Sequence, residues 1–190
     1  NNNLQDLKFG NEGYKLTILD EKILIEGNSI EGVFRGIQTL LQILPNEIVA
    51  SEIQDQSWYV ATGKIEDYPE YSYRGAMLDV SRHFFGVEDV KKYIDLLASY
   101  KINVLHLHLS DDQGFRIESK VFPKLHLEAS DGLYYTQNQI KDIVSYASNL
   151  GIRVVPEIDV PGHASALLTA YPELASHSRK NSIERNAGIF

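Results

Sequence analysis

Three near-continuous apolar runs constrain the fold of this chain more than any other feature. They occupy residues 76–80, 102–109 and 152–158, and a stretch with apolar residues at helical spacing lies between each run and the next. Unbroken apolar runs are typical of parallel strands that are covered on both faces. Strand and helix units in series therefore predict an α/β fold, either a (β/α)8 barrel or a doubly wound sheet.

The two intervening stretches have the pattern of amphipathic helices. The first runs from residue 87 to about residue 101, with an inner side made of Val90, Ile94, Leu97 and Ala98. In the second, Thr136 and Gln139 have the spacing of a capping box, and Gly151 stands where a left-handed residue would end the helix. Its apolar stripe consists of Ile140, Ile143, Val144 and Ala147.

The N-terminal segment has a different pattern. Two β-rich runs at residues 14–19 and 22–26 flank the turn at Asp20 and Glu21 and predict a hairpin. Asn28 and Glu31 have capping-box spacing and predict a helix start. Apolar residues then recur at helical period until Pro45, and we expect this face to pack on the hairpin: Ile30, Val33, Phe34, Ile37, Leu40, Leu41 and Leu44. A further strand is expected at residues 58–60.

A breaker at residues 67–69 predicts a domain boundary. We expect a small α+β domain segment at residues 1–69 and, if the α/β fold is a barrel, the N-terminal portion of a (β/α)8 barrel at residues 70–190. A closed barrel takes about 250 residues, whereas residues 70–190 number only about 120. The sequence therefore predicts a truncated barrel of about three to four βα units.

Composition narrows the classes of function. A 190-residue chain with 43% hydrophobic residues predicts a globular protein, and its net charge of -8 without a Lys/Arg cluster argues against nucleic-acid binding. No apolar run reaches the roughly 18 residues of a membrane span, and the polar N-terminus lacks the features of a signal peptide. The absence of cysteine excludes disulfides, thiolate metal sites and a cysteine nucleophile within these residues.

Candidate functional residues follow the three predicted barrel strands. Arg82 comes after the first strand, Asp111 and Asp112 after the second, and Asp159 and His163 after the third. Active sites of parallel α/β folds lie at the carboxyl ends of the strands, so these side chains should line one mouth. Each also has a structural reading: a salt bridge for Arg82, a helix cap for the Asp pair, and a helix start for His163.

His106 and His108 alternate on one face of the second strand and leave two readings open. They are either core histidines bonded to neighbouring strands or two ligands of a zinc-dependent barrel hydrolase. The zinc reading needs further ligands, and only His163 is a candidate. We therefore expect no metal and no organic cofactor, with the zinc hydrolase as an alternative.

Three stretches resemble one family closely. They are YRGAMLDVSRHF at residues 73–84, HLHLSDDQGFR at 106–116 and VPEIDVPGH at 155–163. In this order they resemble the β-N-acetylhexosaminidases of glycoside hydrolase family 20, and the hairpin and helix before them resemble the end of the small domain that precedes the barrel in that family. The resemblance implies removal of terminal β-linked N-acetylglucosamine or N-acetylgalactosamine, with the substrate's own acetamide oxygen as the nucleophile.

The resemblance also implies roles for individual residues. Arg82 would hold the hydroxyls of the terminal sugar, Asp111 would orient His163, and His163 would tune the general acid. His108 and Asp159 would support this polar network by binding substrate or its neighbours. The family's adjacent Asp-Glu pair, which orients the acetamide and protonates the leaving oxygen, has no counterpart at a strand end here, so we expect this chain alone to be inactive. Phe115 stands where relatives often have Trp, which affects substrate preference.

The expected partner is a glycan or an amino-sugar oligosaccharide such as a chitin fragment. An incomplete barrel exposes strand edges, so we also expect pairing with the missing barrel half or with another copy of the chain. The resemblance favours a secreted, periplasmic or cell-surface location. A non-catalytic carbohydrate-binding or assembly module is the second hypothesis for function.

Overall fold

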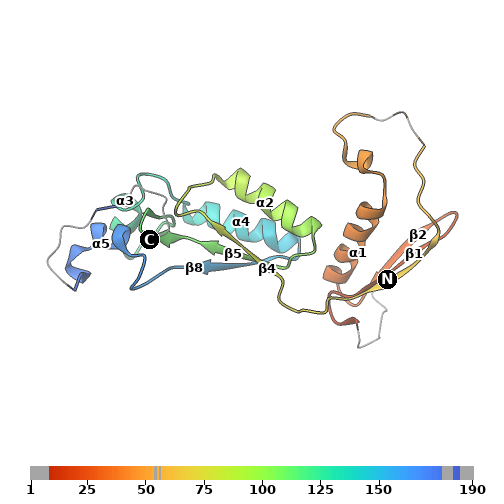
Figure 1. The fold of residues 1–190 in the computed structure, drawn as a ribbon, viewed down its shortest axis with the longest axis horizontal. Coiled ribbons are helices and arrows are strands. Elements are labelled where there is room, and N and C mark those ends of the chain that lie inside the picture. The colour runs from red at the N-terminus through yellow and green to blue at the C-terminus, as the bar shows by residue number, and fades with distance from the viewer. Residues whose placement is uncertain (1–8, 54, 56, 177–181, 185–190) are drawn as a thin grey trace. The chain divides into compact units, whose positions relative to one another are not determined.

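The chain divides into two compact units in the computed structural model, which describes residues 9–53, 55, 57–176 and 182–184 (Figure 1). The first unit contains the residues up to Arg74 together with residues 98–101, and the second contains residues 75–97 and those from Ile102 onward. Within the described residues, no helix is long and apolar enough to cross a bilayer.

The first unit is built on an antiparallel sheet with the strand order β2-β1-β3. Strands β1 (Tyr14–Ile18) and β2 (Ile23–Gly27) form the predicted hairpin. The strand predicted at residues 58–60 is wrong, because the third strand is β3 (Gly63–Asp67), which pairs with the other edge of β1. Its sequence GKIED has a single apolar residue, Ile65, which packs against the β1 core, so hydrophobicity alone did not reveal this strand.

Helix α1 (Ile30–Ile43) packs on β1 and β2 as predicted, but the predicted start of the helix is wrong. Its N-cap is Ser29, whose Oγ accepts a hydrogen bond from the Glu31 backbone at 3.1 Å. Asn28 instead donates to the Gly10 carbonyl at 2.9 Å. The cap therefore lies one residue later than the capping-box spacing indicated. A short 3-10 helix, η2 (Asn46–Val49), follows α1.

The buried face of α1 matches the predicted apolar stripe only in part, because the partly buried Leu40 packs against the β1 core while the buried residues lie outside the stripe. Its buried residues are Gly32, Arg35, Gly36 and Thr39, whereas Ile30, Ile37 and Leu41 are exposed. A Cβ at Gly36 would lie 2.5 Å from Ile25 and 3.0 Å from the Tyr14 ring. The small residues therefore let the helix approach the hairpin closely, and a hydrophobic pattern does not show such an approach.

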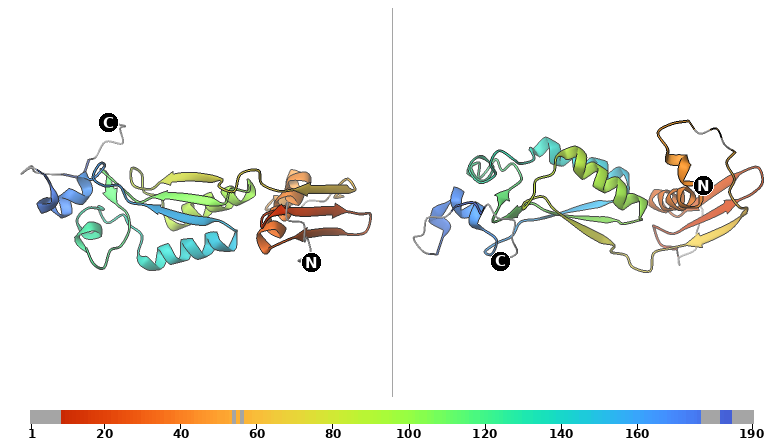
Figure 2. Two further views of the ribbon diagram at one scale, coloured as in Figure 1. Left: turned by 90° about the horizontal axis from the view of Figure 1, so that it is seen from below. Right: turned by 45° about the horizontal axis from the view of Figure 1, so that its top comes forward.

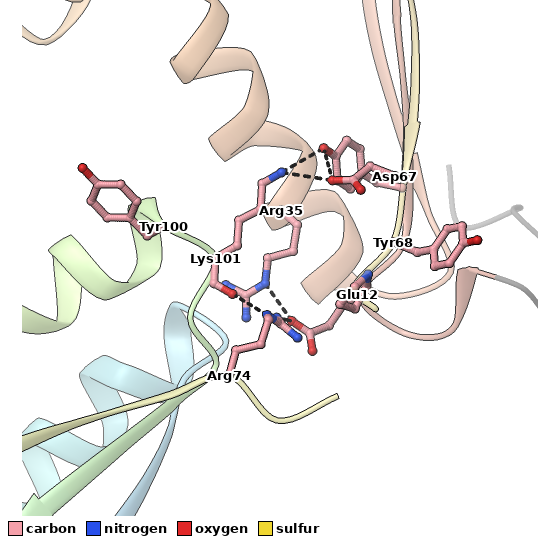
Figure 3. A pocket seen from close by; sticks show the side chains of 9 residues that line it. Glu12, Arg35, Asp67, Tyr68, Arg74, Tyr100 and Lys101 are labelled. Carbon is pink, nitrogen blue, oxygen red and sulfur yellow. Dashed lines mark hydrogen bonds and ion pairs between the residues drawn. The ribbon is translucent and has the colours of Figure 1, made fainter. Parts of the chain in front are cut away.

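A cavity of about 230 Å³ in the first unit is lined by charged and aromatic side chains (Figure 3). Glu12 accepts from Arg35 Nε at 2.9 Å and also pairs with Arg74. Lys101 Nζ lies 3.0 Å from the Tyr14 hydroxyl and 3.2 Å from Asp67 Oδ2. Because these charges neutralise one another, we interpret the cavity as a structural network that ties α1 and β1 to the segments at Arg74 and Lys101.

The second unit contains a parallel sheet with the order β4-β5-β8, made of β4 (Gly75–Asp79), β5 (Val104–His108) and β8 (Arg153–Glu157). These bounds lie within two residues of the prediction. Helices α2 (Val87–Ser99) and α4 (Gln137–Asn149) run along one face of the sheet (Figure 2). They contact each other, because Lys91 Nζ lies 2.8 Å from Asp142 and the Tyr146 hydroxyl donates to Asp95 at 2.6 Å. Sequential strands with both helices on one face fit a barrel, and a doubly wound sheet would place helices on both faces.

Helix α4 begins with the predicted capping box. Thr136 Oγ1 accepts from the Gln139 backbone at 3.2 Å, and the Gln139 side chain accepts from the Thr136 backbone at 2.8 Å. Gly151 follows the helix with φ of 67°, the left-handed conformation that the sequence predicted. This helix end therefore directs the chain into β8.

A long loop joins β5 to α4 and holds the short strands β6 (Ser110–Asp111) and β7 (Gly114–Phe115) and helix α3 (Lys124–Leu127). The buried Arg116 guanidinium organises it by donating to four backbone carbonyls: those of Ser81, Gln113, Ser130 and Leu133. After β8 come α5 (Ser165–Ala170) and η3 (Pro172–Leu174). Phe115 packs against α5 through Ala166 and Ala170, which holds the loops after β5 and β8 together.

Candidate active site

Three charged or polar residues end the three parallel strands in register. The Cα partner of Asp79 in β4 is His108 in β5, whose partner in β8 is Glu157. Paired residues in a parallel sheet point to the same side, and side chains alternate along each strand. Leu105 and Leu107 are fully buried on one side of β5, so the histidines of this strand face the opposite side, away from α2 and α4.

Asp111 is the centre of the site. Its side chain is only 2% exposed, yet it carries contacts from three other side chains. Oδ2 lies 2.8 Å from Arg82 Nη2 and 2.9 Å from His108 Nε2, and Oδ1 lies 3.2 Å from His163 Nδ1. The Asp112 backbone also donates to Oδ1 at 2.7 Å. A buried carboxylate needs such compensation, because an unpaired charge is costly away from water.

Arg82 is held by carboxylates on two sides. Its Nη1 lies 2.6 Å from Asp79 Oδ2, and its backbone N–H donates to Asp79 Oδ1 at 3.0 Å. The hydrogen bond that Arg82 donates to Asp79 raises the pKa of Arg82. Burial raises the pKa of Asp79, but the hydrogen bonds that Asp79 accepts from Arg82 outweigh it, so the pKa of Asp79 is lowered. The guanidinium is a fork of five N–H donors and remains 29% exposed, so it is fixed in orientation and still has donors for a ligand.

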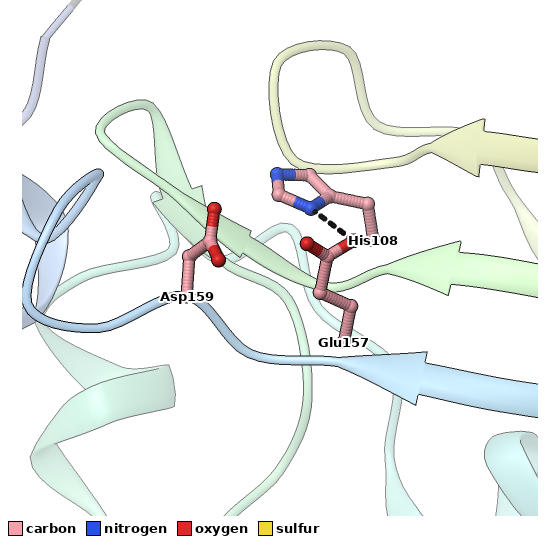
Figure 4. A group of neighbouring side chains, drawn as sticks. All are labelled: His108, Glu157 and Asp159. Atoms are coloured by element: carbon pink, nitrogen blue, oxygen red, sulfur yellow. Dashed lines mark ion pairs between the residues drawn. The ribbon is translucent and has the colours of Figure 1, made fainter.

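His108 and Glu157 point toward each other from the ends of β5 and β8 (Figure 4). His108 Nδ1 lies 3.0 Å from Glu157 Oε2, and the same oxygen lies 2.6 Å from His106 Nε2. Burial lowers the pKa of His108, but the hydrogen bond to Asp111 and the close charge contact with Glu157 outweigh it, so the pKa of His108 is raised. Its contact with His108 lowers the pKa of Glu157 in turn. Each group thus favours the charged form of the other.

His163 reaches Asp111 from the loop after β8. Its backbone has φ of 52°, an uncommon conformation for a residue with a side chain. The Asp112 side chain accepts from the Ser165 backbone at 2.9 Å, which fixes the start of α5 next to it. His163 is 48% exposed while its Nδ1 faces the buried Asp111, so the other ring nitrogen is available to a group in the mouth.

Asp159 also joins the cluster. Its backbone donates to Ser110 Oγ at 3.0 Å, and its carboxylate, His108 and Glu157 each place one atom within 4.8 Å of the others (Figure 4). Asp111, Asp112 and His163 form a second group with this spacing. Such spacing suits a cation, but His108 and Glu157 already pair with each other, so we describe an ion-pair network and assign no metal to it.

The structure thus gathers the five residues singled out from sequence: Arg82, His108, Asp111, Asp159 and His163. Asp79 and Glu157 were missed as site residues. Both are the last residue of their strand, in register with His108. They could have been found by comparing the next-to-last residues of the three predicted strands, because two of these are carboxylates.

The fold and this cluster correspond to a known class. Residues 71–188 match the family model described as glycosyl hydrolase family 20, catalytic domain, and residues 1–68 match the model for domain 2 of the same family. The chain belongs to glycosyl hydrolase family 20, and its parallel sheet is part of the catalytic α/β barrel of that family, preceded by the small domain.

Curated relatives and solved structures agree with this assignment. A beta-hexosaminidase of Porphyromonas gingivalis is 48% identical over 89% of this chain and 23% of its own length. A chitobiase of Flavobacterium johnsoniae is 51% identical, with a TM-score of 0.85 over 94% of this chain and 26% of that one. The β-N-acetylhexosaminidase of Streptomyces coelicolor is 43% identical, with a TM-score of 0.90, and the match covers 93% of this chain and 37% of that one. The chain therefore spans about a quarter to a third of the length of these relatives.

Proposed function

We propose that the polypeptide containing this chain removes terminal β-linked N-acetylglucosamine or N-acetylgalactosamine from glycans or chitin-like oligosaccharides. The observation that carries the proposal is the cluster of Arg82, Asp111 and His163 at the strand ends of a family 20 barrel. Named relatives support the substrate class, since one is a chitobiase and a Streptomyces plicatus relative was solved with N-acetylglucosamine as product.

In this proposal the substrate's acetamide oxygen attacks its own anomeric carbon while the glycosidic C–O bond breaks and the general acid protonates the leaving oxygen, unlike the two-carboxylate scheme of most retaining glycosidases. Arg82 donates to hydroxyls of the terminal sugar, because Asp79 and Asp111 hold its fork in one orientation. Asp111 orients His163, which acts on the general acid. His108 and Asp159 support this network, and no metal or organic cofactor takes part.

The general acid and the acetamide-orienting Asp are supplied from outside these residues. The only adjacent Asp-Glu pair in the sequence is Asp20-Glu21, which lies in the turn between β1 and β2, in the other unit from Arg82. We therefore propose that the 190-residue chain alone does not turn over substrate. We also propose that residues 1–69 and 70–190 are the two domain segments.

An assay with an aryl N-acetyl-β-glucosaminide tests this proposal. The polypeptide with the complete barrel is expected to release the aryl group, and the 190-residue chain is expected to release none above the buffer blank. Turnover by the 190-residue chain at the rate of the complete barrel would refute the claim that it lacks the catalytic pair. Sugar binding without turnover by the complete barrel would favour the non-catalytic carbohydrate-binding module instead.

A further inference from the structure

We propose that Glu157 is a positioning residue for Asp111 and acts through His108. The inference rests on the proposed function, because it concerns how the sugar-binding cluster is kept in its working arrangement. Glu157 contacts His106 and His108, so its link to Asp111 passes through the His108 ring. The sequence of contacts is then Glu157, His108, Asp111, His163, with Arg82 joined at Asp111.

The His108 ring has a carboxylate at each nitrogen. Nδ1 lies 3.0 Å from Glu157 Oε2, and Nε2 lies 2.9 Å from Asp111 Oδ2. A neutral imidazole has one N–H and one lone pair, so it would turn the lone pair toward one of these carboxylates. Only the imidazolium carries an N–H on each nitrogen and a positive charge between the two carboxylates; Nε2 makes a hydrogen bond to Asp111, whereas Nδ1 meets Glu157 as a charge contact and, within the described part of the chain, neither Nδ1 nor Glu157 Oε2 makes a hydrogen bond. The ring is 4% exposed, so water does not replace either contact.

Carboxylates face His108 from every strand packed against it. Asp79 faces it from the end of β4, Asp111 from β6, Glu157 from the end of β8, and Asp159 from the loop after β8. The neighbouring cation is Arg82, which shares Asp111 with it, and His106 lies beyond Glu157 on the same oxygen. The surrounding carboxylates therefore favour the charged form of His108.

Loss of that cation would act on Asp111. Its Oδ2 is shared by Arg82 and His108, so a neutral His108 leaves Arg82 as the sole cation on this oxygen. The guanidinium is then drawn toward Asp111 and away from the sugar, and the carboxylate no longer has a fixed position from which to orient His163. Glu157 thus sets the geometry of the site through its contact with His108.

Glu157→Gln in the polypeptide with the complete barrel tests the proposal, because it removes the charge and keeps the shape. We expect kcat for an aryl N-acetyl-β-glucosaminide to fall at least tenfold, with KM changed less than threefold. The matched control is Glu128→Gln, a surface glutamate whose loss of charge should leave both constants unchanged. A Glu157→Gln enzyme with wild-type kcat would overturn the proposal.

A double-mutant cycle separates action through His108 from a general structural effect. His108→Gln retains an amide donor toward Asp111 but no cation, so adding Glu157→Gln should lower kcat no further. If the losses in kcat of the two single variants multiply in the double variant, Glu157 does not act through His108. Nitrogen-15 NMR of the wild-type ring supplies a measurement that needs no variant: both ring nitrogens should be protonated at neutral pH, and a neutral ring would overturn the proposal.

The same experiments keep the two proposals distinct. Absence of hydrolysis by the wild-type complete barrel would refute the proposed function, and with it the effect of Glu157 on catalysis. If the wild-type enzyme hydrolyses the substrate and Glu157→Gln does so at the same rate, only the positioning role of Glu157 is refuted.

Discussion

At the scale of single residues, Asp111 explains most of the site. One carboxylate that is 2% exposed binds a guanidinium and two imidazoles, which fixes three side chains from three different segments relative to one another. Buried ion clusters of this kind are poor sources of stability, because desolvation opposes the Coulomb attraction. Their retention is better explained by the geometry that they impose on the mouth of the barrel.

Arg82→Lys should damage catalysis more than its conservative chemistry suggests. A lysine is a point charge and cannot reach both Asp79 and Asp111 in the fork arrangement while donating to the sugar. We expect kcat/KM to fall at least a hundredfold, about 3 kcal/mol of transition-state stabilisation. The measurement is steady-state kinetics in the complete barrel, with Lys92→Arg, at an exposed residue of α2, as the control. A loss below threefold would show that the fork is not used.

Asp79 gives a pH-dependent contribution to stability. Its pKa is lowered in the folded chain, so its contribution is present above the unfolded value of about 4 and is lost as the pH falls through the lower folded value. The free energy of unfolding of Asp79→Asn should therefore lie below that of wild type at pH 7, with the gap closing below pH 4. Urea titrations from pH 7 to acid pH measure this gap, and a gap that does not narrow as the pH falls below 4 would contradict the assignment.

At the scale of helices and strands, the sequence correctly predicted those elements whose local pattern had a single interpretation. The β4, β5 and β8 runs and the α4 capping box were predicted because apolar runs and cap residues act locally. The buried face of α1 was predicted only in part, because Gly32 and Gly36 permit a close approach that a hydrophobic stripe does not reveal. β3 was missed because pairing with β1, a long-range contact, makes its polar sequence a strand.

The close contact of Gly114 with Arg116 gives a prediction at this scale. A Cβ at Gly114 would lie 2.2 Å from Arg116 Cζ, and the guanidinium cannot move without losing its backbone carbonyl partners. Gly114→Ala should destabilise the second unit by about 2 kcal/mol, within the usual range for overpacking. Gly86→Ala is the control, since its Cβ would meet only Asp89 at 3.8 Å. Equal thermal midpoints for the two variants would refute this role of Arg116.

At the scale of the whole molecule, the order of the strands decided between the two folds that the sequence left open. Sequential parallel strands with α2 and α4 on one face leave the other face for Asp79, His108 and Glu157. The (β/α)8 assignment is confirmed by the match to the family 20 catalytic domain. The site could be predicted as a group of strand-end residues, but its pairing could not, because the register that places His108 between two carboxylates is set by tertiary contacts.

A metal-independent reaction is expected at this scale as well. Because His108 and Glu157 pair with each other, dialysis of the complete barrel against a chelator should leave its hydrolytic rate unchanged. Metal analysis of the purified protein is the second measurement. Stoichiometric zinc that is lost on His106→Ala, together with loss of activity, would support the zinc hydrolase instead.

If the substrate's acetamide is the nucleophile in this family 20 barrel, with Arg82, Asp111 and His163 holding the sugar and its acid catalyst in place, a substrate without the acetamide should not react. The most direct measurement compares hydrolysis of an aryl N-acetyl-β-glucosaminide with that of the matching aryl β-glucoside, which lacks the acetamide, by the complete barrel. We expect turnover of the aryl N-acetyl-β-glucosaminide and no turnover of the aryl β-glucoside above the uncatalysed rate. Comparable turnover of both substrates would contradict the acetamide mechanism.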